Sequence, residues 1–103
     1  MSIQSTYLTT TANVVYTSSG TTASMTFYMA NYSTSANANF SIWAVPNGGT
    51  PSNLNVLYSN VRVTAGDTYL ASTERLILDN GDSLYAYCSA NNVMSVTLTH
   101  TPV

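Results

Sequence analysis

The chain has 103 residues, which is the size of one globular domain with its own core. Only 6% of the residues are charged: two arginines, no lysine and four carboxylates. Two arginines cannot form the basic patch that phosphate neutralisation requires, so we expect no nucleic-acid partner. The single cysteine, Cys88, excludes an intrachain disulfide and a thiolate metal site, and we interpret it as a small buried hydrophobe.

Neither an export signal nor a membrane helix is predicted. No positive segment precedes an apolar run at the N-terminus, and no stretch approaches the roughly 20 apolar residues of a membrane span. We therefore expect a protein made in a cytoplasm, without a membrane partner. Asn31 and Asn39 match the N-glycosylation pattern, but without export we interpret them as ordinary loop and strand residues.

Residues 1–12 are rich in Ser and Thr, with isolated Ile3, Tyr7 and Leu8. Ordering twelve residues costs on the order of 1 kcal/mol or more each, and burying three side chains cannot offset that cost. We therefore predict an N-terminal arm over residues 1–12 that grips a neighbouring subunit, followed by a β-sandwich domain over residues 13–103.

The first half of that domain alternates as strands do. Residues 13–17 predict a strand, and residues 18–20 predict the turn that ends it. Residues 23–32 predict a long half-buried strand with an inward and an outward set. The inward set is Met25, Phe27 and Met29, and the outward set is Thr26, Tyr28, Ala30 and Tyr32. In residues 40–45, we expect Phe40, Ile42 and Ala44 to point inward and Trp43 and Val45 to point outward.

The second half is punctuated by turn residues. Residues 46–53 predict an exposed loop, residues 54–64 a strand, and residues 65–67 a hairpin-type turn. Asn80-Gly81 predicts a two-residue hairpin between residues 76–78 and 84–88, because Asn and Gly tolerate positive φ at both corners. Its second arm alternates Leu84, Ala86 and Cys88 against Tyr85 and Tyr87. The last strand, residues 93–100, alternates Met94, Val96 and Leu98 with Ser and Thr.

The fold class follows from these patterns. No helical period persists, and β-branched or aromatic residues dominate every apolar run, so the chain is predicted to be all-β. About eight short strands in one domain are typical of an antiparallel β-sandwich. Jelly-roll and immunoglobulin-like topologies both fit, and the missing Cys-Trp-Cys signature favours a jelly-roll-like order.

No pattern predicts catalysis or a cofactor. Residues 79–82 could be imagined as a calcium loop, but two carboxylates around Asn-Gly also suit an exposed turn. His100 has no second ligand at metal-binding spacing, and no Gly-x-Ser-x-Gly elbow exists. We therefore expect a protein that is not an enzyme and holds no metal or cofactor.

The outward sets instead predict a contact side. They comprise Tyr28, Tyr32, Trp43, Val45, Tyr85 and Tyr87, and Tyr and Trp are enriched at interfaces. Three interpretations stay open: cross-strand pairing of aromatic side chains, a protein interface, and a platform on which sugars stack. The candidate interface is this set together with Ile3, Tyr7 and Leu8 of the arm.

Several turn-and-strand patterns resemble small virion proteins of tailed bacteriophages. They are residues 13–17, the break at 31–39, Val45-Pro46-Asn47-Gly48-Gly49, residues 63–68, residues 78–86 and the Ser/Thr-rich last strand. The resemblance implies a β-sandwich that serves structurally in the virion, assembled in the host cytoplasm. It implies either a head decoration (cement) protein or a module of a tail or fibre. We take the decoration protein as the leading hypothesis, a homotrimer that binds the major capsid protein between coat subunits. The alternative is a tail or fibre module that binds carbohydrate or a receptor.

Overall fold

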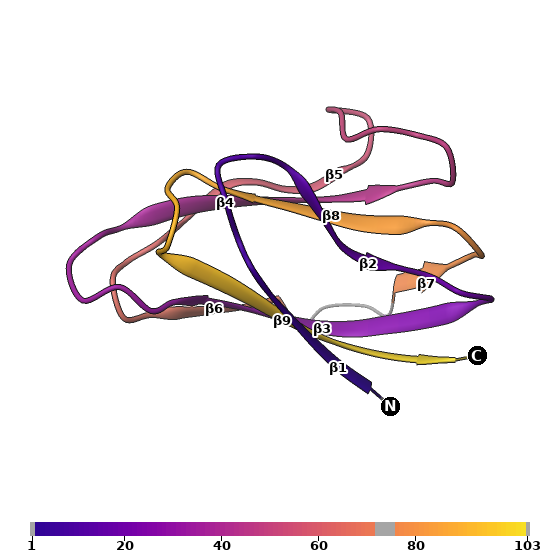
Figure 1. The fold of residues 1–103 in the computed structure, drawn as a ribbon, viewed down its shortest axis with the longest axis horizontal. Coiled ribbons are helices and arrows are strands. Elements are labelled where there is room, and N and C mark those ends of the chain that lie inside the picture. Colours follow the sequence, from indigo (N-terminus) through magenta and orange to yellow (C-terminus); the bar gives the residue numbers. More distant parts are fainter. Residues whose placement is uncertain (1, 72–75, 103) are drawn as a thin grey trace.

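A computed structural model describes residues 2–71 and 76–102, which form nine strands and no helix. The strands are β1 (Ser2–Tyr7), β2 (Asn13–Thr17), β3 (Thr22–Asn31), β4 (Ala38–Val45), β5 (Val56–Val63), β6 (Thr68–Ala71), β7 (Leu76–Leu78), β8 (Ser83–Cys88) and β9 (Met94–Pro102). The pairings among the described strands are antiparallel, and the strands form two packed layers (Figure 1). The prediction of an all-β sandwich is therefore confirmed.

The strand order is that of a jelly roll. The first sheet runs β1-β9-β3-β6, with β7 also paired to β3, and the second sheet runs β2-β8-β4-β5. The chain changes sheet at most connections, and β4 and β5 are the consecutive strands that pair directly. This alternation between the two sheets produces the nested Greek keys of the jelly-roll topology.

Two predicted hairpins are wrong, because each turn leads from one sheet to the other. Asn80-Gly81 joins β7 of the first sheet to β8 of the second. Gly81 has a φ of 87°, whereas Asn80 does not have the positive φ that a type I′ hairpin requires. Residues 65–67 likewise join β5 of the second sheet to β6 of the first.

Strands β6 and β7 share one edge of β3. Tyr69 of β6 pairs with Met29, and Ile77 of β7 pairs with Ala23, so the two short strands follow one another along β3. Between these strands the sequence predicts either a bulge or a short crossover at residues 72–75, which lie outside the described residues.

The core lies between the two layers and follows the predicted alternation closely. Leu84, Ala86 and Cys88 of β8 are buried, as are Met94, Val96 and Leu98 of β9 and Phe40 and Ile42 of β4. Phe27 and Met29 of β3 are also buried, while the side chain of Met25 lies outside the described set. Ala44, predicted inward, is only partly buried and packs against this core.

Residues 2–8 belong to the sandwich, which corrects the predicted arm. β1 pairs with β9 from Ser2 opposite His100 to Tyr7 opposite Ser95, so the two ends of the chain lie side by side (Figure 1). Leu8 is 2% exposed and its N–H donates to the Met94 carbonyl at 2.9 Å. Backbone hydrogen bonds to β9 stabilise the segment. The predicted arm rested on the burial of three side chains alone and did not include these hydrogen bonds.

A buried asparagine fastens the end of β3. Asn31 is 2% exposed, and its Nδ2 donates to the carbonyls of Ala36 at 2.8 Å and Val63 at 3.0 Å. Its Oδ1 accepts the Ser33 N–H at 3.0 Å. One side chain therefore ties β3 to the β3–β4 connection and to the end of β5 in the other sheet.

Candidate interaction surface

The outer face of the first sheet carries the most exposed large side chains of its strands. The register places Tyr28 of β3 between Leu70 of β6 and Thr97 of β9, and Thr97 lies opposite Ser5 of β1. The next row places Ser95 opposite Tyr7. Because neighbouring side chains of one row share a face, these residues form a continuous surface across the sheet. We call it the β1–β9–β3–β6 face.

Its apolar side chains are strongly exposed. The exposed fractions are 73% for Ile3, 74% for Tyr7, 53% for Leu70, 46% for Tyr32 and 43% for Tyr28. No charged side chain belongs to the described rows of this face, whose remaining positions are Ser, Thr and Ala. A neutral surface of Tyr, aliphatic and hydroxyl side chains resembles the centre of protein interfaces, where charged residues are depleted.

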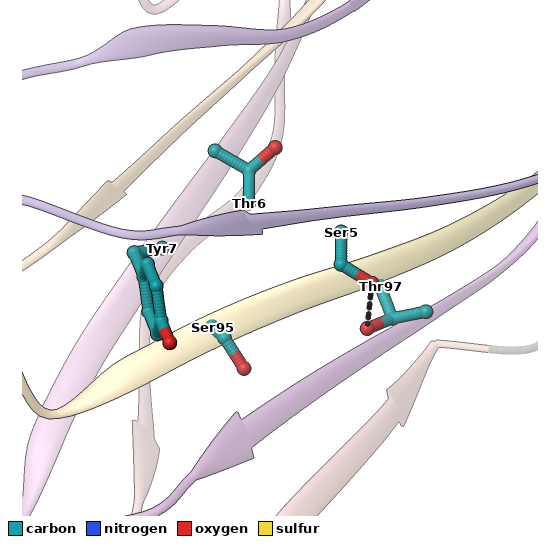
Figure 2. A pocket seen from close by; sticks show the side chains of 5 residues that line it. All are labelled: Ser5, Thr6, Tyr7, Ser95 and Thr97. Atoms are coloured by element: carbon teal, nitrogen blue, oxygen red, sulfur yellow. Dashed lines mark hydrogen bonds between the residues drawn. The ribbon is translucent and has the colours of Figure 1, made fainter.

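β1, an edge strand of the first sheet, carries its large apolar side chains on its outer side and polar side chains on its other side. Ile3, Ser5 and Tyr7 point to the outer face, while Gln4 and Thr6 lie on the other side of the strand (Figure 2 shows Thr6 opposite Tyr7). Gln4 Nε2 donates to the Val15 carbonyl of β2 at 2.6 Å and so links the two sheets at this edge. The apolar residues of β1 are thus available to a partner through the face rather than the edge.

A shallow hollow of about 280 Å³ lies on this face, lined by Ser5, Tyr7, Ser95 and Thr97 and by Thr6, whose side chain points away from the other four (Figure 2). Ser5 Oγ and Thr97 Oγ1 are hydrogen-bonded at 3.0 Å. The Tyr7 ring meets the Tyr32 ring edge to face, with centroids 5.9 Å apart, and this contact orients the ring at the rim. The hollow offers hydroxyl groups beside an exposed aromatic ring and no charge.

The nine predicted interface residues do not form one surface. Tyr28, Tyr32, Ile3 and Tyr7 share the β1–β9–β3–β6 face. Trp43 and Tyr85 lie opposite each other on β4 and β8, on the other side of the sandwich, and Tyr87 lies opposite Ser41. Trp43, Tyr85 and Tyr87 are half-buried, as expected for aromatic side chains that cover one another and their neighbours across strands.

The other two predicted interface residues are buried. Leu8 belongs to the core, and Val45 is 3% exposed. Val45 is covered because the loop after β4 turns back on it: a β-carbon built on Gly49 would lie 3.3 Å from Val45 Cγ1. The predicted exposure of Val45 is therefore wrong, because alternation within β4 could not show that the following loop covers this side chain.

Sequence reasoning missed Leu70 and the hydroxyls of Ser5, Ser95 and Thr97 as surface components. Leu70 follows Tyr69 in a short apolar run. Strand alternation, with Tyr69 inward, would have indicated that Leu70 points outward. Ser95 and Thr97 alternate with the core residues of the last strand, so their outward direction was predictable, but their neighbours were not.

Other kinds of site have little support among the described residues. No three His, Cys, Asp or Glu side chains gather there as metal ligands, and no membrane-spanning helix occurs in that part of the chain. The Asp82 carboxylate instead accepts the N–H groups of Asn47 at 2.9 Å and Asp79 at 3.0 Å. Comparison of the chain with protein-family models, curated proteins and solved structures gives no match.

Proposed function

We propose that the protein is a non-enzymatic structural component of a tailed-bacteriophage virion that stabilises the head by binding between coat subunits. The β1–β9–β3–β6 face would make the contact. The observation that carries the proposal is the exposure of Ile3 and Tyr7, at 73% and 74%, on a face whose described positions hold no charge. Fully burying one such side chain contributes about 1.5–3 kcal/mol, so a partner gains most at these two positions.

The fold is compatible with a structural role in a virion and also with carbohydrate binding. Jelly rolls recur in viral capsid proteins and in lectins, although a fold does not by itself determine a function. Between these two classes, the turn-and-strand patterns that resemble those of small virion proteins favour a structural role in a virion. The partner would then be the major capsid protein or another protein of the particle.

Self-association is the second part of the proposal. With a formal net charge of −2 on 103 residues, electrostatic repulsion between copies is weak. We propose a homotrimer at the local three-fold positions, where several coat subunits meet. A trimer would hold three copies of the face against the coat lattice and so raise the apparent affinity by multivalency.

Sedimentation velocity and electron microscopy test the two parts. The Ile3→Ser/Tyr7→Ser double variant should weaken self-association and head binding, whereas Val14→Ser, a 46% exposed position on the second sheet, should leave both unchanged. Wild-type protein that stays monomeric across micromolar concentrations would contradict the trimer. Labelled protein found on tails and not on heads would contradict the decoration role.

A tail or fibre module that binds carbohydrate is the alternative function. It is favoured by the hollow beside Tyr7, where Ser5, Ser95 and Thr97 bring hydroxyls close to an exposed ring. Trp43, the first choice for stacking from the sequence, is half-buried in the other sheet. Glycan-array binding that Tyr7→Ser abolishes and Trp43→Phe preserves would favour this alternative over the capsid role.

A further inference from the structure

Two Asn-Gly dipeptides, Asn47-Gly48 and Asn80-Gly81, meet at one end of the sandwich. The Asn47 side chain rests on Gly81: a β-carbon built on Gly81 would lie 2.6 Å from Asn47 Cγ. Asn-Gly is the dipeptide in which the following backbone nitrogen most easily attacks the asparagine carboxamide, because glycine has no side chain to obstruct the approach. The two copies differ in how freely these atoms can move.

In Asn80-Gly81, hydrogen bonds restrain both groups that would react. The Gly81 N–H donates to the Ser18 carbonyl at 2.9 Å, which engages the attacking nitrogen. Asn80 Oδ1 accepts the Gly20 N–H at 3.0 Å, which holds the carboxamide that would be attacked. The reaction therefore requires local opening of this turn.

The Asn47-Gly48 pair lacks both restraints. Both residues are exposed, and the turn is closed by a hydrogen bond from the Gly49 N–H to the Pro46 carbonyl at 2.9 Å. Within the described part of the chain, neither the Gly48 N–H nor the Asn47 carboxamide has a hydrogen-bond partner. The Asn47 side chain can leave Gly81 without losing a hydrogen bond.

We propose that Asn47 is a site of spontaneous deamidation in the folded protein and that Asn80 is protected. The Gly48 nitrogen attacks Asn47 Cγ and loses its proton as the new N–C bond forms. The carboxamide nitrogen leaves as ammonia, which yields a succinimide. Water then opens the ring at either carbonyl and gives aspartate or isoaspartate at position 47, so one water is consumed, one ammonia is released, and no oxidant or reductant is needed.

Deamidation would place a new carboxylate beside the Asp82 carboxylate. Both oxygens of the Asp82 carboxylate accept backbone N–H groups, those of Asn47 and Asp79. A new carboxylate at position 47 would repel Asp82 and change the formal net charge from −2 to −3, that is, −2 − 1. Because the same loop covers Val45, the modification should loosen the cover over the end of β4.

Peptide mapping by mass spectrometry tests the inference on the intact protein in mildly alkaline buffer, with and without urea. In native buffer we expect Asn47 to deamidate at least about tenfold faster than Asn80, because two hydrogen bonds must open first at Asn80. In urea the two rates should become similar. Equal native rates, or an Asn47 that reacts in urea but not in the folded protein, would overturn the proposal.

Matched variants separate the site from its consequence. Asn47→Gln should abolish the early acidic species on ion exchange, and Asn80→Gln should leave it unchanged; the opposite pattern would overturn the assignment. Asn47→Asp reproduces one product, and hydrogen exchange at the end of β4 should be faster in it than in wild type. Unchanged exchange would refute the proposed loosening.

Discussion

The stability of the Leu8→Ala variant tests whether the N-terminal segment packs against the core of its own chain. Leu8 is 2% exposed and packs in the core, next in sequence to Tyr7, which is 74% exposed. Truncating a buried leucine costs about 2–5 kcal/mol, through lost burial and the cavity left behind. For a domain of about 100 residues, each kcal/mol corresponds to roughly 4–8 °C in Tm, so we expect a loss of about 8 °C or more.

The matched control is Tyr7→Ala, which leaves the core intact and should lower the free energy of unfolding of the monomer by only about 0.5–1.5 kcal/mol, through loss of the edge-to-face contact with Tyr32. Urea unfolding followed by fluorescence, at two protein concentrations, measures both variants. A Leu8→Ala protein as stable as wild type, at both concentrations, would mean that Leu8 is not buried within its own chain. The segment would then be an arm that docks on a neighbour, as the composition of residues 1–12 predicted.

Two further pairs of variants test the joints between the sheets. Asn31→Ala should lower the free energy of unfolding by roughly 2–4 kcal/mol, because three hydrogen bonds are lost and buried carbonyls stay unpaired. The control is Asn37→Ala at an exposed position, which loses one hydrogen bond from the Ala65 N–H. It should lower the free energy of unfolding by about 1 kcal/mol or less. Equal losses in urea titrations would refute the special role of Asn31. Gly81→Ala and Gly20→Ala should each cost about 1–2 kcal/mol, since φ is 87° and 76°. Hydrogen exchange in the loop after β4 should rise in Gly81→Ala alone, because its methyl group displaces Asn47, and an equal rise in both would argue against that contact.

The candidate surface shows where strand patterns stop being informative. Alternation correctly separated outward Tyr28 and Tyr32 from buried Phe27 and Met29, because side-chain direction is a local property of a strand. It also separated Tyr85 from Leu84 and Ala86. A sandwich has two outer faces, however, and alternation within one strand carries no information about which of them a residue shares with another strand.

The sequence by itself determined the all-β class, the turn positions, most strand bounds and the inward sets of β8 and β9. These depend on short-range backbone preferences and on a period of two, which are legible in consecutive residues. Only the tertiary structure decided that Asn80-Gly81 crosses between sheets, that β1 pairs with β9 across 88 to 98 residues of chain, and that a loop covers Val45. These features arise from pairing and packing between distant segments, whose free energies depend on the partner that each segment meets and are not contained in either segment alone.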